Sequence, residues 1–339
     1  MDKVHEFLLR LTSNDNDTRK AAEAALQSVE QNPSFITGLF QIICSPALAR
    51  PASAGPDYDE SMVRTMAVLV FTKIVRKHWI AGPGEPRLFS DDIKSKIRAG
   101  ILQAMFNSGS SKARTTLAVV VGHIAQFDWP ERWPALFPSL FQAVSGAALQ
   151  ADRASKPYQM ALSGLRCLSV IAEDICDETL FKLMPLTMPR LLTMVQAPSI
   201  AISVKKDVLR ISTSFLKGLS VLRHHKQQVL TTLGASALPG WVNLSFQVLR
   251  GPLSPKLHGL KLLVLRFHDT LLSGYRKSLS SGNVKDIIAS QIFNLRLYAA
   301  LQTKSLVEHD IDPPTDDDGE KFEVESVTMA TFGCLRRIA

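Results

Sequence analysis

The strongest constraint on the fold of this chain is a helical hydrophobic period that recurs in segment after segment. Apolar residues repeat three and four positions apart, and no convincing alternating strand pattern interrupts them. Turns rich in Ser, Asn, Asp, Gly and Pro separate the segments. At 339 residues the chain exceeds the size that one compact core usually supports. The pattern therefore predicts an all-α protein with several cores or a stacked array.

The expected helices form antiparallel pairs. They cover residues 2–12, a segment ending near 30, 35–44, 60–79, a segment capped by Ser90, 111–126, 134–148, 157–174, segments capped by Asp177 and Ser199, 235–250, a segment opening at Ser254 and Pro255, and 283–306. Pro185 and Pro189 are expected to kink their helix. Pairs that recur at about 40–50 residues indicate a HEAT-repeat α-solenoid, a right-handed superhelix of antiparallel helix pairs.

A corner rich in Trp and Pro occupies residues 128–140, where two Trp and three Pro lie between two helical patterns. Proline fixes φ and biases the residue before it toward extended geometry, so one helix ends here and another begins. Pro134 suits the first turn of the second helix. For Pro138 two alternatives remain, a helix that starts only there or a helix bent in its first turn. Both indoles are predicted to be buried between stacked helices.

Charge is distributed unevenly along the sequence. The formal net charge is +8, but residues 308–325 hold nine acids and one lysine, a net −8, which leaves +16 elsewhere. The acidic segment is predicted to help recruit a basic partner, and the alternatives are a solubilising linker or an autoinhibitory contact with the basic second helices. The excess of cations elsewhere admits nucleic acid or an acidic membrane surface as a partner. The four cysteines lie far apart and are interpreted as reduced core residues of an intracellular protein.

The sequence offers no recognisable catalytic or cofactor site. It contains no nucleophile elbow, no phosphate-binding Gly-Lys loop and no metalloprotease His pair. His224 and His225 are neighbours whose side chains point about 100° apart on a helix, so they are interpreted as surface residues and not as metal ligands. We expect no enzyme activity, no cofactor and no metal. No apolar run approaches the roughly 18 residues of a membrane span, and no signal peptide is recognised.

Four sequence pieces in order resemble the amino-terminal domain of the importin-β superfamily of nuclear transport receptors. They are residues 21–26, residues 32–42, residues 63–79 with their terminal Lys-His-Trp, and residues 124–136 with their Trp-Pro pairs. The resemblance covers about the first 140 residues closely and the remainder by architecture. It divides the chain into Ran-binding repeats at 1–140, further repeats at 141–306, an acidic inter-helix loop at 307–325, and the start of a next, truncated repeat at 326–339.

The resemblance implies a receptor that shuttles between cytoplasm and nucleus as a monomer. Such receptors line a concave face with their second helices and bind the small GTPase Ran in its GTP form. The implied Ran contacts are Arg19, Glu23, Arg64, Thr72, Lys73, Arg76, Lys112 and Arg114. Thr72 departs from the lysine that many relatives carry. The implied structural motif consists of Trp79, Asp128, Trp129, Pro130, Trp133 and Pro134.

The acidic loop suggests a finer assignment to the importin nine branch, which carries histones and ribosomal proteins. Its residues are Asp312, Asp316, Asp317, Asp318 and Glu320. The main expectation is therefore import of basic cargo past the FG-repeat proteins of the nuclear pore. Two alternatives stay open. An exportin would bind cargo together with Ran-GTP, whereas a basic HEAT scaffold would bind nucleic acid with a steep dependence on salt.

Overall fold

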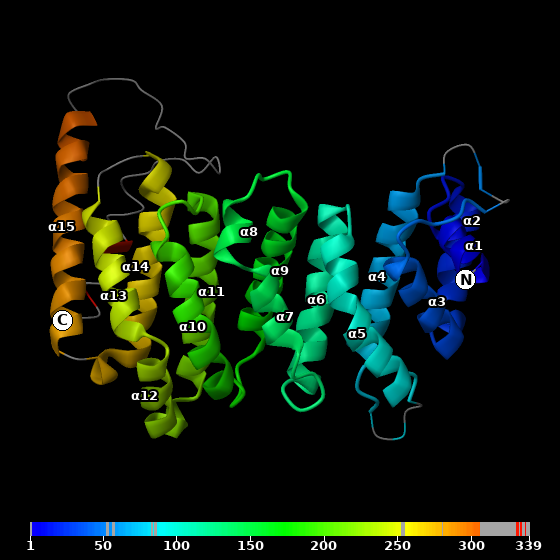
Figure 1. Ribbon diagram of the computed structural model, residues 1–339, viewed down its shortest axis with the longest axis horizontal. Helices are drawn as coiled ribbons and strands as arrows, with labels where there is room; N and C mark the ends of the chain where they lie inside the picture. Colours follow the sequence, from blue (N-terminus) through cyan, green and yellow to red (C-terminus); the bar gives the residue numbers. More distant parts are fainter. Residues whose placement is uncertain are drawn as a thin grey trace. The chain divides into compact units, whose positions relative to one another are not determined.

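The computed structural model describes residues 2–51, 54–55, 58–82, 84, 87–251, 255–279, 281–305, 330–331, 333 and 336. Over these ranges the regular structure is helical and no strand is present (Figure 1). The chain divides into two compact units. Unit 1 comprises Met1–Ser145 and Arg153–Ile171, and unit 2 comprises Gly146–Asp152 and Ala172–Ala339.

Unit 1 consists of stacked helix pairs, and the second helices of two consecutive pairs pack on each other. Its helices are α1 (Asp2–Leu11), α2 (Asn16–Val29), α3 (Pro33–Cys44), α4 (Glu60–His78), α5 (Asp91–Asn107), α6 (Ser111–Asp128), α7 (Leu136–Ala143) and most of α9 (Lys156–Asp174). Helices α1 and α2, α3 and α4, and α5 and α6 pack as pairs, and contacts of α3 with α5 and of α4 with α6 join consecutive pairs. The predicted all-α HEAT-type arrangement is confirmed.

Side-chain caps define where the early helices begin. The side chains of Asp15, Asn32, Asp59, Ser90 and Ser110 each accept a backbone N–H in the first turn of the helix that follows them. Such caps satisfy donors that a helix start leaves unpaired. Ser90 acts as the sequence predicted. The bounds of these helices therefore follow from local polar residues as much as from apolar spacing.

The core of unit 1 lies between the helix layers. A Cβ on Gly122 of α6 would lie 2.6 Å from the side chain of Val170 on α9, so glycine permits this close approach of the two helices. Pairs are also fastened at their ends. Arg64 of α4 donates to the carbonyl oxygens of Ile42 and Ser45, and Arg114 of α6 donates to that of Ser108. Each arginine thus satisfies carbonyls at the end of the preceding helix.

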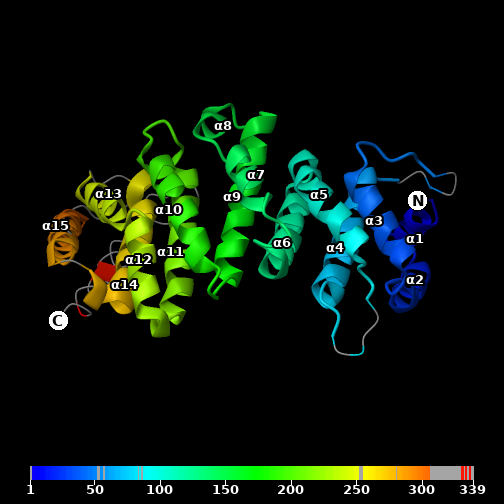
Figure 2. The ribbon, with the colours of Figure 1, turned by 60° about the horizontal axis from the view of Figure 1, so that its bottom comes forward.

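Unit 2 continues the paired architecture. Its helices are α8 (Gly146–Gln150), α10 (Leu180–Gln196), α11 (Ile202–Val221), α12 (Lys226–Ala235), α13 (Leu238–Arg250), α14 (Pro255–Tyr275) and α15 (Ser281–Ser305), with the short 3-10 helices η1 (Arg223–His225) and η2 (Arg276–Ser278). Both views place α13 between α10 and α15 (Figure 2). Trp241 donates to the carbonyl of Met188 and Tyr275 to that of Leu216, which ties α13 to α10 and α14 to α11.

Three sequence expectations about helix bounds are wrong. The single helix expected over 134–148 is two helices, because Val144 leaves the helical region at φ −87° and ψ 66°. Ser199 does not cap α11, since residues 197–200 form a turn and Ala201 precedes the helix. Asp177 does not directly precede α10 either. Its side chain accepts the N–H of Thr179, which is itself the residue before the helix.

Other expectations have mixed outcomes. Helix α13 begins at Leu238 and not at 235, because Ala237 has a left-handed φ of 57°. Helix α10 runs continuously through Pro185 and Pro189, and the kink stays a prediction. The acidic loop and most of the segment 326–339 lie outside the described residues. Within the described part of the chain, no helix is long and apolar enough to cross a bilayer.

Candidate functional site

Helices α4 and α6 of unit 1 carry a strong excess of positive charge. Their cations are Arg64, Lys73, Arg76, Lys77, Lys112 and Arg114. The two helices contain only two acids, and both are already paired. Glu60 lies 2.6 Å from Arg64, and Asp128 lies 2.7 Å from Arg98 of α5. The uncompensated charge on these neighbouring helices is therefore positive, which favours an acidic partner.

Lys73 and Lys77 form the best-defined part of this basic surface. Both ammonium groups contact the carboxylate of Glu30, with Nζ of Lys73 at 3.1 Å from Oε2 and Nζ of Lys77 at 3.4 Å from Oε1. The Glu30 side chain is 4% exposed, whereas the lysine side chains are 53% and 57% exposed. Burial would raise the pKa of Glu30, but the two lysines outweigh it and hold this pKa below its usual value.

The remaining candidates for partner contact divide by exposure. Arg76 and Lys112 are exposed on α4 and α6, and Glu23 is exposed on α2. Thr72 donates its hydroxyl to the carbonyl of Val68, one turn earlier on α4. Arg19 bonds Asn16 on its own helix at 2.7 Å. Among these residues, Arg76 lies on α4 between Lys73 and Lys77, whereas Lys112 lies at the start of α6.

Arg64 and Arg114 are placed differently from the other candidates. Besides its bonds to carbonyls, Arg64 pairs with Glu60 on its own helix, and Arg114 donates to the side-chain oxygen of Gln159 at 3.0 Å. Their guanidinium groups are thus used within unit 1, at the ends of α3 and α5. This geometry favours a structural role for both arginines over direct contact with a partner.

The Trp-Pro corner is a compact turn with a buried carboxylate at its centre. The carbonyl of Asp128 accepts the N–H groups of Arg132 and Trp133, and its side chain is fully buried. Trp129 is extended at φ −92° and ψ 141°, as expected before a proline, and the Trp129–Pro130 peptide is cis. Its ring meets that of Phe137 edge to face at 4.7 Å between centroids. Trp129 and Trp133 are both buried.

The start of α7 shows where Pro134 and Pro138 lie relative to the helix. Leu136 donates its N–H to the carbonyl of Trp133, so Pro134 lies in a turn before the helix and not in its first turn. The helix begins at Leu136. Pro138 falls in its first turn, where a backbone N–H has no partner within the helix and its absence costs nothing.

Trp79 packs beside a second charged cluster, formed by Lys94 and Asp128 next to the corner. Its ring is buried at the end of α4, packs against Phe89 at 5.2 Å, and lies 5.1 Å from Nζ of Lys94 on α5. Burial lowers the pKa of Lys94, and the nearby Asp128 carboxylate opposes that shift. Trp79, Lys94 and Asp128 thus connect the ends of α4, α5 and α6.

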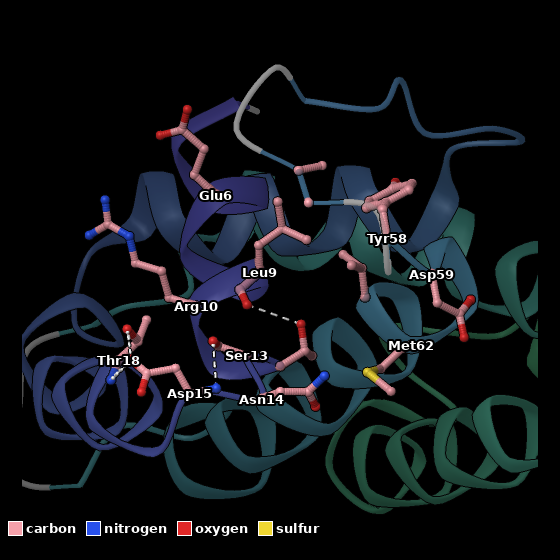
Figure 3. Close-up of a pocket in the computed structure, with 14 residues that line it drawn as sticks. Glu6, Leu9, Arg10, Ser13, Asn14, Asp15, Thr18, Tyr58, Asp59 and Met62 are labelled. Carbon is pink, nitrogen blue, oxygen red and sulfur yellow. Dashed lines mark hydrogen bonds between the residues drawn. The ribbon is translucent and has the colours of Figure 1, made fainter.

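Two of the surface depressions of unit 1 lie beside these clusters. The first is lined by the end of α1, the turn to α2 and the start of α4, with Tyr58 and Met62 on one side (Figure 3). Of its three acids, Asp15 and Asp59 already cap α2 and α4, and Glu6 is an exposed residue of α1. The second groove runs between α5 and α7. Its apolar lining includes Leu102, Phe106, Trp133 and Met160.

Sequence reasoning missed the acid that organises the lysines. Glu30 was only the expected end of a helix, and its pairing with Lys77 joins residues 47 positions apart. Arg98 and Lys94 were likewise not singled out from the sequence. No local motif marks such partners. The one signal in the sequence was an acid, Glu30, at the end of α2, with several cations on α4 further along the chain.

Comparison with curated proteins gives relatives for part of the chain, while no family model matches it. The importin-alpha re-exporter of Schizosaccharomyces pombe is 31% identical over 133 residues, which is 39% of this chain and 12% of that protein. Exportin-2 of Oreochromis niloticus is 23% identical over 132 residues, again 39% of this chain and 12% of that protein. The matched region is thus a small part of these curated relatives.

Solved structures extend the likeness in fold to nearly the whole chain. The exportin Cse1 in its cargo-free, cytoplasmic state matches with a TM-score of 0.59 and 14% identity over 99% of this chain and 34% of that one. Kap121p bound to RanGTP matches with a TM-score of 0.52 and 14% identity over 99% of this chain and 32% of that one. Neither set of relatives supports the finer importin nine assignment. The first part of the chain is thus similar in sequence to export receptors, and the chain as a whole shares the helical-repeat fold of Cse1 and Kap121p.

Proposed function

We propose that this chain is the Ran-binding part of a nuclear export receptor. The observation that carries the proposal is the 31% identity with an importin-alpha re-exporter, supported by the match to exportin-2. We propose export and not the import that was expected from the acidic loop, because the curated relatives are named as export receptors. Importin-α is the proposed cargo. Histone and ribosomal cargo gain no support from the comparisons.

Ran-GTP is proposed to bind the basic surface of α4 and α6. The exposed cations Lys73, Arg76, Lys77 and Lys112 supply positive potential on neighbouring helices, and the acids of these helices are already paired. A fold neighbour, Kap121p, was solved bound to RanGTP. Binding, and not catalysis, is the proposed mechanism. Because Ran's switch loops are ordered around GTP, the GTP form alone should present the complementary surface.

A titration with nucleotide-loaded Ran tests this proposal. The full chain should bind Ran loaded with a non-hydrolysable GTP analogue far more tightly than Ran-GDP. Charge reversal at Lys73 and Arg76 together should weaken binding, whereas reversal at the exposed Lys20 of α2 should change it little. Equal affinity for both nucleotide forms would contradict the receptor function. A steep loss of nucleic-acid binding with added salt would instead favour the basic scaffold.

Contact with the nuclear pore is a second part of the proposal. Kap121p was also solved bound to Nup53p, with a TM-score of 0.54 to this chain at 14% identity. The groove lined by Leu102, Phe106 and Met160 offers apolar side chains that an aromatic residue of an FG repeat can contact. Such contacts would let the receptor shuttle between nucleus and cytoplasm. Loss of FG-peptide binding on Met160→Glu, a change at a half-buried residue of the groove, with Ran binding retained, is the expected result.

A further inference from the structure

We propose that Glu30 is a positioning residue that holds Lys73 and Lys77 as a preformed pair for an acidic group of the bound GTPase. This inference rests on the proposed Ran-binding function and names a residue that acts on that surface without touching the partner. Glu30 lies at the end of α2, and the two lysines lie one turn apart on α4. The contact therefore crosses from the first helix pair to the second.

The backbone of Glu30 is fixed before its side chain is considered. Its N–H donates to the carbonyl of Leu26 at 2.9 Å, and its φ of −63° and ψ of −20° continue the helical path. The carboxylate is then directed onto α4, where almost none of its surface remains accessible. A buried carboxylate is stable only when it is paired. The two lysines supply that pairing.

Exposure shows which way the three side chains face. Lys73 and Lys77 keep more than half of their side-chain surface accessible while the carboxylate between them is covered. An ammonium group has three N–H donors, so each lysine retains donors for a partner while it pairs with Glu30. The three side chains carry a net charge of +1. Two half-exposed lysine side chains thus lie over one covered carboxylate, an arrangement that suits a partner carboxylate.

Fixing the lysines in advance should affect how long a complex lasts. A free lysine samples many rotamers and loses that freedom when a partner holds it, which weakens binding. Glu30 restricts both lysines before the partner arrives. Removing its charge makes the surface more positive, so electrostatic steering of the first encounter should not be slowed. The loss should appear in dissociation.

The test compares Glu30→Gln with Glu6→Gln in the full chain. Glu6 is an exposed acid on α1, so its replacement makes the same change in net charge. Association and dissociation of Ran loaded with a GTP analogue are measured by surface plasmon resonance at two salt concentrations. Dissociation from Glu30→Gln should be about tenfold faster than from the wild type, without slower association, and Glu6→Gln should dissociate at the wild-type rate.

A double-mutant cycle separates positioning from a general structural role. In a Lys73→Gln, Lys77→Gln background, Glu30→Gln should cause no further acceleration. Glu30→Asp, which keeps the charge but shortens the side chain, should accelerate dissociation as Glu30→Gln does. It replaces Glu30→Gln in the rate measurement if Glu30→Gln lowers the melting temperature. Two results would overturn the inference. One is dissociation at the wild-type rate from Glu30→Gln or Glu30→Asp, and the other is an equal acceleration when Glu30→Gln is added to the Lys73→Gln, Lys77→Gln protein. A wild type that binds both nucleotide forms alike would instead refute the proposed function.

Discussion

Arg98 of α5 holds the carboxylate of Asp128, at the end of α6, by an ion pair of 2.7 Å in which the Asp128 side chain is completely buried. The other carboxylate oxygen, Oδ1, is buried without a hydrogen-bond partner among the described residues. Arg98 therefore supplies the neutralising contact on which this buried charge depends. The same aspartate carbonyl organises the Trp-Pro turn, so the pair ties the third helix pair to the corner that follows it.

Loss of Arg98 should be strongly destabilising. Arg98→Met is expected to lower the free energy of unfolding of unit 1 by about 3–5 kcal/mol, because it leaves a buried charge unpaired. Lys20→Met replaces an exposed cation of α2 in the same unit and should change this free energy by about 0.5 kcal/mol or less. Urea unfolding followed by Trp fluorescence measures the effect, since Trp79, Trp129 and Trp133 lie in unit 1. Similar losses for both variants would contradict this account of the pair.

Trp133 is predicted to be structural. It is 5% exposed, so Trp133→Ala should cost roughly 3–5 kcal/mol of unfolding free energy. Phe127→Ala is the control, because that ring is 48% exposed, and it should change stability by about 0.5 kcal/mol or less. Melting temperature and Ran binding are measured together. A Trp133→Ala protein that melts like the wild type and loses Ran binding would show instead that the indole belongs to the partner surface.

Arg64 and Arg114 are expected to act on stability more than on binding. Arg64→Met should lower the free energy of unfolding of unit 1 by about 1–3 kcal/mol, because carbonyls of Ile42 and Ser45 lose a charged donor. Its effect on Ran-GTP affinity should be small. Arg76→Met, which removes an exposed cation of the same helix, should show the opposite pattern. Isothermal titration and urea unfolding of both variants decide between these roles.

Lys261 should give unit 2 an unusual dependence on pH. It donates to the carbonyls of Leu249 and Gly251, and burial lowers its pKa from 10.5 to about 8. Between about pH 8 and 10 the unfolded chain therefore binds more protons at this site than the folded chain, so the free energy of unfolding should rise with pH. Below pH 8 Lys261 is protonated in both the folded and the unfolded chain, so the folded chain carries the full cost of burying the charged ammonium group.

Comparison with Lys261→Met isolates this effect from other titrating groups. The free energy of unfolding of the wild type minus that of the variant should increase by about 2 kcal/mol from pH 7.5 to 9.5. Urea unfolding followed by circular dichroism provides both values at each pH. A difference that stays constant over this range would show that the pKa of Lys261 is not lowered by burial.

Helical period and capping residues were enough to predict the architecture and most helix bounds. Ser90 marked the start of α5, and the prolines around Trp129 and Trp133 marked the break between α6 and α7. The break at Val144 was not predicted, because it depends on backbone angles of an apolar residue that fits a helical pattern. Local signals therefore succeeded where a polar or proline residue marks a boundary.

The candidate surface was predicted less completely. Composition identified the cations of α4 and α6, but not which of them face a partner. Arg64 and Lys73 look alike in sequence, yet one donates to carbonyls of α3 and the other pairs with Glu30 of α2 while staying exposed. These contacts join residues distant in the chain and depend on helix packing. The fold gives no sign of a transport direction, so the proposal of export rests on the similarity to export receptors.

The most direct test of the export function measures the affinity of the full-length receptor for importin-α with and without Ran-GTP. An export receptor binds both together, so Ran-GTP should tighten importin-α binding, with a coupling of about 1–3 kcal/mol, and Ran-GDP should not. Linkage requires importin-α to tighten Ran-GTP binding by the same factor. Release of importin-α on addition of Ran-GTP would contradict the account and identify an import receptor.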